Sequence, residues 1–145
     1  MSNELVLRWG IVSAGFISQD FCTALKSFNT DKHVLSAVAA RKLDDAEKFA
    51  QKYNISRFYD SYDKLFEDKE VNIVYIGSIN TSHRELCLKA IAAGKHVLCE
   101  KPMSISCAEQ EEVLTAAKEK NVFFMEVKFR LSTWIKEKLD HFRLD

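Results

Sequence analysis

The sequence predicts an α/β fold, in which a doubly wound parallel sheet of six strands carries helices on both faces. The first observation is an alternation along the chain. Short apolar or β-branched runs are followed by longer segments whose apolar residues recur three or four positions apart. The second is the composition, because 145 residues that are 47% hydrophobic and 29% charged are typical of a globular domain with one buried core.

The charge balance, the N-terminus and the cysteine spacing predict the kind of partner, the location and the state of the thiols. Lys plus Arg equals Asp plus Glu at 21 each, so no net field favours nucleic acid or a membrane, and a small molecule is the expected partner. The N-terminus lacks a signal-peptide pattern and no apolar run approaches roughly 18 residues, so a cytoplasmic location is expected. No C-x-x-C pair is present, which favours buried free thiols over disulfides or zinc at all four cysteines: Cys22, Cys87, Cys99 and Cys107.

The first strand is predicted from the apolar run of residues 5–12, and a helix over residues 16–28 follows it. Four apolar residues of this helix fall roughly on one side: Phe16, Phe21, Leu25 and Phe28. That side is expected to pack on the sheet. The second strand covers residues 33–40 and ends before Arg41.

Asp44 is expected to cap the second helix, which runs through Tyr53. Glu47, three residues after it, completes an acidic variant of the capping box. Three residues of this helix are expected to face inward: Ala46, Phe49 and Ala50. A short third strand over residues 57–60 and a helical turn or two over residues 61–68 come next.

The fourth strand, residues 71–78, is apolar on both faces, as a central parallel strand should be. Thr81 or Ser82 caps the next helix, which stops at Gly94, where a left-handed residue is expected. The fifth strand covers residues 95–100.

Ser106 opens a helix that extends to about Lys120, with four residues expected to face inward: Ala108, Val113, Ala116 and Ala117. Residues 122–127 form the sixth strand. The expected Rossmann-type domain therefore covers residues 1–128, and its ligand site is expected where the strand order reverses.

The tail, residues 129–145, breaks the alternation. It is charged, and its apolar residues recur at helical spacing: Leu131, Trp134, Ile135, Leu139 and Phe142. One C-terminal amphipathic helix is therefore expected.

The stretch "WGIVSAGFIS", Trp9 to Ser18, lies where a G-x-G-x-x-G dinucleotide fingerprint would fall, between the first strand and the first helix. Of its glycines only the middle one, Gly15, is present, and Ser13 and Ser18 take the outer positions. The backbone would pass nearest a pyrophosphate at Gly15, and the Ser13 hydroxyl can donate a hydrogen bond to a phosphate oxygen. The loop alone fits equally a plain strand-to-helix turn, so both interpretations stay open.

Arg41 and Lys42 follow the second strand, at the place where an NAD site carries an acidic residue about 20 residues beyond the glycines. A guanidinium pairs with a 2′-phosphate in fork geometry, whereas a carboxylate repels it. The pattern therefore favours NADP over NAD. One of the two acidic residues that follow, Asp44 and Asp45, is expected to be used in the helix cap. The alternative is that Arg41 and Lys42 are solvated surface cations.

Lys101 stands in the stretch "AAGKHVLCEKPMS", directly after the fifth strand. A lysine there lies beside the expected nicotinamide position, where it can hydrogen-bond a substrate hydroxyl and assist its deprotonation as hydride leaves the same carbon, provided that its surroundings lower its pKa toward the working pH. Glu100 could orient the lysine, and Pro102 stiffens the turn. Lys101 is therefore the catalytic candidate, and the alternative is an ordinary exposed exit from a strand.

Four stretches, in order and at matching spacing, resemble the nucleotide-binding half of the Gfo/Idh/MocA oxidoreductase family over about residues 5–130: "LRWGIVSAGFIS", "AVAARKLDDAEKFAQKY", "IGSINTSHRELCLKAIAAGKHVLCEKPMS" and "VFFMEV". The resemblance implies a Rossmann-type fold, NADP as cofactor and no metal. It also implies oxidation of a hydroxyl group of a cyclic diol or sugar, with Lys101 binding or activating that hydroxyl.

The family pattern places the loop after the fourth strand and the helix start that follows it at the border of the cofactor. His83, at this helix start, has the chemistry of a catalytic base, but the pattern favours a cofactor-side or structural role for it. The full set of expected cofactor-binding residues is Gly10, Ser13, Gly15, Phe16, Ile17, Arg41, Ser78, Ile79, Asn80, His83, Glu100 and Lys101.

The family also has a second domain that covers the nicotinamide, contributes to the substrate site and makes the homodimer, and the chain ends at Asp145, before that domain. The resemblance therefore implies a truncated chain, the cofactor-binding half of such an enzyme, which lacks most of the contacts to its small-molecule substrate. Two other classes stay open: a catalytically silent NADP-binding module, and an interaction fragment that pairs with another chain.

Overall fold

Strands and helices alternate through the part of the chain that the structure, a computed structural model, describes, namely residues 5–28 and 30–127. In chain order the elements are β1 (Leu7–Val12), α1 (Phe16–Lys26), β2 (His33–Ala39), α2 (Leu43–Tyr53), β3 (Arg57–Tyr59), α3 (Tyr62–Glu67), β4 (Ile73–Ile76), the 3-10 turn η1 (Asn80–Ser82), α4 (His83–Ala92), β5 (His96–Cys99), α5 (Cys107–Glu119) and β6 (Phe124–Glu126).

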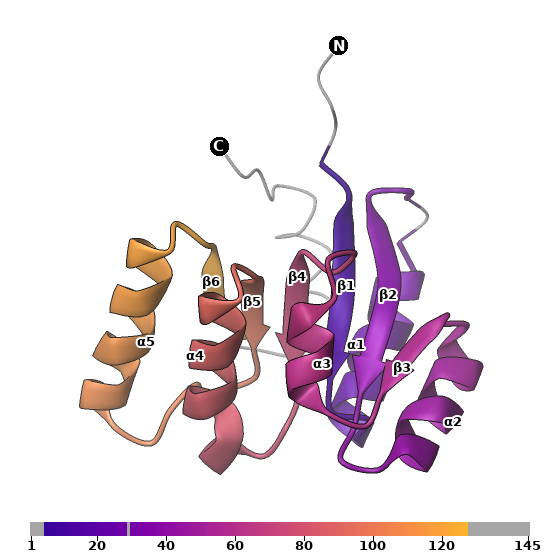
Figure 1. Ribbon diagram of the computed structural model, residues 1–145, viewed down its shortest axis with the longest axis horizontal. Coiled ribbons are helices and arrows are strands. Elements are labelled where there is room, and N and C mark those ends of the chain that lie inside the picture. The colour runs from indigo at the N-terminus through magenta and orange to yellow at the C-terminus, as the bar shows by residue number, and fades with distance from the viewer. Residues whose placement is uncertain (1–4, 29, 128–145) are drawn as a thin grey trace.

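The six strands form one sheet in the order β3-β2-β1-β4-β5-β6, and every pairing is parallel. Figure 1 shows α3, α4 and α5 in front of this sheet and α1 behind it. The predicted doubly wound α/β fold is therefore confirmed. The strand order reverses between β1 and β4, so the loops that leave these two strands diverge at the carboxyl edge of the sheet.

Two apolar cores hold the helices against the sheet. One lies under α1 and α2 and includes Trp9, Phe21 and Tyr75. The rings of Phe21 and Tyr75 stack with their centroids 3.9 Å apart. The other lies under α3, α4 and α5 and includes Leu65 and Ile91. Because both faces of the central strands are buried, these strands read as nearly continuous apolar runs in the sequence.

The helix caps agree with the sequence in part. Ser106 caps α5, since its side chain accepts a hydrogen bond from the Glu109 backbone N–H, and Gly94 ends α4 with a φ of 74°. The prediction that Asp44 caps α2 is wrong, because Lys42 occupies that position and makes no side-chain cap. Asp44 lies inside the first turn, where its carboxylate pairs with Lys48 at 2.7 Å one turn later.

Two helical residues expected to face the sheet are exposed instead. Phe16 is 87% exposed at the start of α1, and Ala108 is exposed at the start of α5. Both stand in the first turn of a helix that begins at the carboxyl edge of the sheet. The predicted C-terminal helix of residues 129–145 lies outside the described residues. Within the described part of the chain, no helix combines the length and apolarity needed to cross a membrane.

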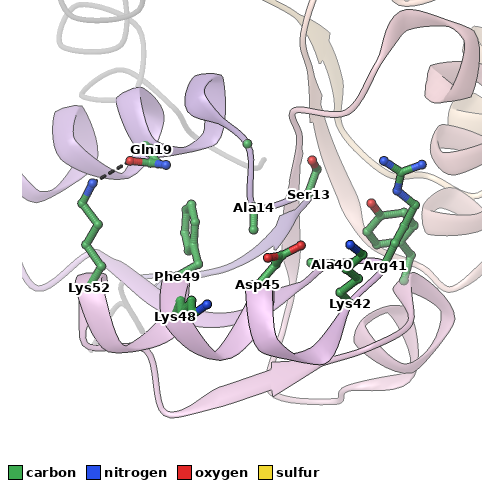
Figure 2. A pocket seen from close by; sticks show the side chains of 12 residues that line it. Ser13, Ala14, Gln19, Ala40, Arg41, Lys42, Asp45, Lys48, Phe49 and Lys52 are labelled. Atoms are coloured by element: carbon green, nitrogen blue, oxygen red, sulfur yellow. Dashed lines mark hydrogen bonds between the residues drawn. The ribbon is translucent and has the colours of Figure 1, made fainter.

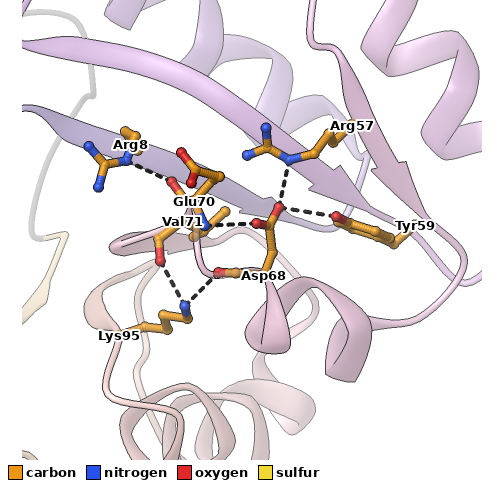
Figure 3. Close-up of polar contacts among 7 residues, drawn as sticks. All are labelled: Arg8, Arg57, Tyr59, Asp68, Glu70, Val71 and Lys95. Carbon is orange, nitrogen blue, oxygen red and sulfur yellow. Dashed lines mark hydrogen bonds and ion pairs between the residues drawn. The ribbon is translucent and has the colours of Figure 1, made fainter.

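A polar cluster with no counterpart in the sequence prediction lies at the amino-terminal edge of the sheet (Figure 3). Lys95, immediately before β5, is only 7% exposed, and its ammonium donates to the backbone carbonyls of Asp68 and Val71, each at 2.7 Å. The Asp68 carboxylate accepts hydrogen bonds from Arg57 at 2.8 Å and from the Tyr59 hydroxyl at 3.1 Å. These contacts tie the entries to β3, β4 and β5 together.

Three of the four cysteines are buried, as predicted, but Cys107 is exposed at the start of α5, so the prediction is wrong there. Burial raises the pKa of Cys22 to about 12, from an ordinary value near 9.0. An increase of about three units lowers the thiolate fraction about 1000-fold at neutral pH.

We therefore expect an aromatic disulfide reagent to modify Cys107 in the native protein at least about 100-fold faster than the other three thiols. Release of the chromophoric thiol, followed over time, measures this. The variant Cys107→Ser should lose the fast phase, and unfolding in urea should make all four thiols of the parent chain react. A second fast thiol in the native state would contradict the burial.

Candidate functional site

The candidate site lies at the carboxyl edge of the sheet, around the divergence of β1 and β4. Four connections meet at this edge, namely those that follow β1, β2, β4 and β5. Most of the predicted site residues lie in these connections. The first two border one cavity, whereas Lys101 and the residues after β4 lie outside it.

The turn after β1 has a positive φ angle at a position where glycine is usual, but the residue there is Ser13. Ser13 has a φ of 86°, a left-handed conformation that favours glycine and that a serine adopts only at a cost of about 1–3 kcal/mol. Its backbone N–H continues the sheet by donating to Ala39 at 3.0 Å. The conformation that the first fingerprint glycine normally provides is therefore kept, although the residue is serine.

Gly15 leaves open space at the start of α1. A Cβ atom placed on it would meet only the Ser13 hydroxyl, at the ordinary contact distance of 3.7 Å. The packing of the described residues thus gives no reason for a glycine here, whereas close approach of a ligand does. Gly15 is the N-cap of α1 and supplies no side-chain cap, so the first backbone N–H groups of the helix remain available to an anion.

Ser18 and Gly77 meet where α1 crosses the end of β4. Ser18 is fully buried, and a Cβ on Gly77 would lie only 2.5 Å from its hydroxyl oxygen. The close helix-to-strand approach that the third fingerprint glycine usually allows is obtained here because the partner residue has no side chain. Sequence reasoning identified Ser18 but missed Gly77, whose importance depends on a contact between distant parts of the chain.

A cavity of about 500 Å³ opens between α1, α2 and the turn that carries Ser13 (Figure 2). Its lining residues are Ser13, Ala14, Gly15, Gln19, Ala40, Arg41, Lys42, Asp45, Lys48, Phe49, Lys52 and Tyr62. Arg41 and Lys42 are exposed and form no ion pair with any described residue. The N-terminus of α2 beside them has no side-chain cap. Free cations and free N–H groups at one end of a cavity make a site for an anion.

Lys101 is exposed directly beyond β5, and its peptide bond to Pro102 is cis. Glu100 does not pair with Lys101, although sequence reasoning gave it the role of orienting that lysine. Its carboxylate instead accepts a 2.6 Å hydrogen bond from the hydroxyl of Tyr75. Burial, together with this contact, raises the pKa of Tyr75, so the phenol stays protonated and donates. Tyr75 was missed because nothing in the sequence of β4 marks it.

His83 links the connection after β4 to the connection after β5. It is 1% exposed, and its Nδ1 and Nε2 atoms lie 2.6 Å from the Pro102 carbonyl oxygen and 2.8 Å from the Ser78 carbonyl oxygen. Since the side chain is buried and each ring nitrogen faces a backbone carbonyl oxygen, neither nitrogen is accessible to a substrate hydroxyl. The geometry therefore favours the structural role for His83 over that of a catalytic base.

The other predicted residues divide into two groups. Phe16, Ile17, Ile79 and Asn80 are exposed at the carboxyl edge, where a bound ligand can contact them. Gly10 is different, because it lies inside β1 and a Cβ on it would be 2.8 Å from Cδ2 of Leu65 and 2.9 Å from Cγ1 of Val71. The missing side chain of Gly10 thus makes room for α3, and its role in cofactor binding stays a prediction.

The chain is similar to known oxidoreductases over most of its length. A family model of the Gfo/Idh/MocA type, described as an oxidoreductase family with an NAD-binding Rossmann fold, matches residues 7–128. Two curated relatives named trans-1,2-dihydrobenzene-1,2-diol dehydrogenase match over 122 residues, which is 84% of this chain. The Mus musculus protein is 48% identical and the Danio rerio protein 46%. The chain spans 37% and 36% of their lengths, so it corresponds to little more than a third of each.

The solved structures that the chain resembles are also oxidoreductases. A 3-ketoreductase from Actinomadura kijaniata in complex with NADP and TDP-benzene has a TM-score of 0.80 and 26% identity, covering 94% of this chain and 42% of that one. An NAD-binding oxidoreductase from Klebsiella pneumoniae has a TM-score of 0.79 and 28% identity, covering 94% of this chain and 39% of that one.

Proposed function

The chain belongs to the Gfo/Idh/MocA oxidoreductase family, and from this premise we propose that it binds NADP at the carboxyl edge of its sheet. We further propose that it is the cofactor-binding part of a dehydrogenase that oxidises a hydroxyl group of a cyclic diol or a sugar. One observation carries the proposal. The strained turn at Ser13, the open surface at Gly15 and the unpaired Arg41 border a single cavity.

The two ends of this cavity suit the two charged parts of NADP. The pyrophosphate fits the start of α1, because the first N–H groups there are uncapped and Gly15 leaves them accessible. The 2′-phosphate fits the start of α2, where Arg41 offers a planar guanidinium and Lys42 an ammonium. An NAD site would instead place a carboxylate at the position of Arg41.

In this proposal Lys101 is the catalytic residue. When bound, the nicotinamide of NADP supplies the acceptor for hydride. The Lys101 ammonium lies at the same edge of the sheet, where its Nζ atom can hold the substrate hydroxyl and stabilise the charge that develops on its oxygen as the proton passes to solvent water and hydride leaves the same carbon. The substrate class follows from the diol dehydrogenases that the chain is similar to, and D-xylose is the sugar to test beside a trans-dihydrodiol.

Replacing Arg41 by alanine is expected to raise the dissociation constant of NADPH about 30-fold and to change that of NADH less than about twofold. The loss corresponds to one charge-assisted interaction with the 2′-phosphate, which NADH lacks. Fluorescence of the reduced nicotinamide, titrated with both coenzymes, measures the two constants. Lys118→Ala, which removes a charge from an exposed site on α5, is the matched control and should leave both constants unchanged.

Equal losses for NADPH and NADH in Arg41→Ala would contradict the NADP assignment. Catalysis is tested separately, by following the absorbance of reduced coenzyme formed from NADP and D-xylose or a trans-dihydrodiol. Lys101→Met should abolish this signal while leaving NADPH affinity unchanged. Coenzyme binding without turnover of any diol or sugar would agree both with a cofactor-binding half that lacks its second domain and with a silent binding module, whereas turnover that Lys101→Met abolishes would exclude the silent module.

A further inference from the structure

Asp45 brings a negative charge into the cavity where the 2′-phosphate is proposed to bind. It lies in the first turn of α2 and lines the cavity together with Arg41 and Lys42. Figure 2 shows its carboxylate directed from α2 toward the turn that carries Ser13 and Ala14. Within residues 5–28 and 30–127 it accepts no hydrogen bond and forms no ion pair. Its charge acts on Lys48 through space, and its oxygens are free to accept a hydrogen bond from a ligand.

The neighbouring acid behaves differently. Asp44 is 70% exposed, pairs with Lys48 at 2.7 Å and is not part of the cavity lining. Of the two lysines further along α2 that line the cavity, Lys48 is held by this pair and Lys52 donates to the Gln19 side chain at 2.6 Å. The uncommitted charges at the start of α2 are thus two cations, Arg41 and Lys42, and one carboxylate, Asp45.

We propose that Asp45 sets the coenzyme preference of this site and that, because of it, the protein accepts NADH as well as NADPH. The inference rests on the proposed function. A free carboxylate accepts a hydrogen bond from the ribose 2′-hydroxyl of NADH, in the way an acidic residue does in NAD sites. The same carboxylate repels a 2′-phosphate and offsets part of the attraction from Arg41 and Lys42.

The test compares the dissociation constants of NADPH and NADH for the parent chain and for Asp45→Asn. The substitution removes the charge and keeps the size of the side chain. NADPH is expected to bind about five- to tenfold more tightly and NADH no more tightly than before, so the preference for NADPH rises by about that factor. Glu47→Gln removes the same charge from an exposed position on α2 outside the cavity and should change the preference less than twofold.

The outcomes separate this inference from the proposed function. If the parent chain binds NADPH but Asp45→Asn changes the preference no more than Glu47→Gln does, or weakens NADPH, the role of Asp45 is refuted and NADP binding stands. If the parent chain binds neither coenzyme, the proposed function and the inference both fail. Asp45→Ser serves as a second variant, because Asp45 is exposed and makes no contact that folding requires.

Discussion

The variant His83→Ala is expected to lose about 4 kcal/mol of unfolding free energy, because it removes a buried ring and the N–H donation that this ring makes to backbone carbonyl oxygens. These oxygens belong to Ser78 and Pro102, which lie in the connections after β4 and β5. A neutral ring donates to one of these oxygens and a protonated ring to both, and donation from Nδ1 to the Pro102 carbonyl is the contact that joins the two connections. Urea unfolding followed by the fluorescence of buried Trp9 measures the loss.

Two further variants show whether the contacts or the bulk of the ring matter. His83→Gln keeps a side-chain donor and should lose less stability than alanine does. Thr81→Ala, at an exposed position two residues earlier, should change stability by less than about 0.5 kcal/mol. A loss below about 1 kcal/mol in His83→Ala would show that the ring does not bridge the loops. Because Lys101 precedes Pro102, we also expect His83→Ala to reduce any turnover more than it reduces NADPH affinity.

The fold could be predicted from sequence because the signals that determine it are local. The alternation of strand and helix patterns, the cap at Ser106 and the left-handed Gly94 are each visible within a few residues. The helix start near Asp44 was misplaced by two residues, since an acid in a first turn can either cap the backbone or pair with a lysine one turn later. The sequence alone does not show which of these contacts forms.

The site was predicted less completely because part of it depends on contacts between distant segments. The turn at Ser13 and the position of Arg41 follow from the spacing of a known motif. The contact of Ser18 with Gly77 and the hydrogen bond from Tyr75 to Glu100 do not, because each joins residues that only the folded sheet brings together. The same limitation applies to Gly10, whose contact with α3 could not be read from the sequence of its own strand.

Lys95 gives a prediction at the opposite edge of the sheet. Burial lowers its pKa from the ordinary 10.5, because the ammonium has lost most of its water. Replacing it by methionine removes the donor to the carbonyls of Asp68 and Val71 and should cost about 3 kcal/mol of unfolding free energy at neutral pH. Lys69→Met, an exposed lysine in the connection between α3 and β4 that also holds Asp68 and Val71, should change stability by less than about 0.5 kcal/mol.

The pH dependence of this difference has a definite sign. Between the lowered pKa of the folded state and 10.5, the unfolded chain binds more protons at Lys95 than the folded chain does, so the contribution of Lys95 to stability rises with pH. A neutral amine still has two N–H groups, one for each carbonyl, so the hydrogen bonds survive deprotonation. The stability difference between the parent chain and Lys95→Met should therefore grow as urea unfolding is repeated from neutral pH toward 10.5. Ionisation of tyrosines and cysteines is common to both proteins and cancels. A difference that stays flat or shrinks would mean that the ammonium is as well solvated in the fold as it is in water.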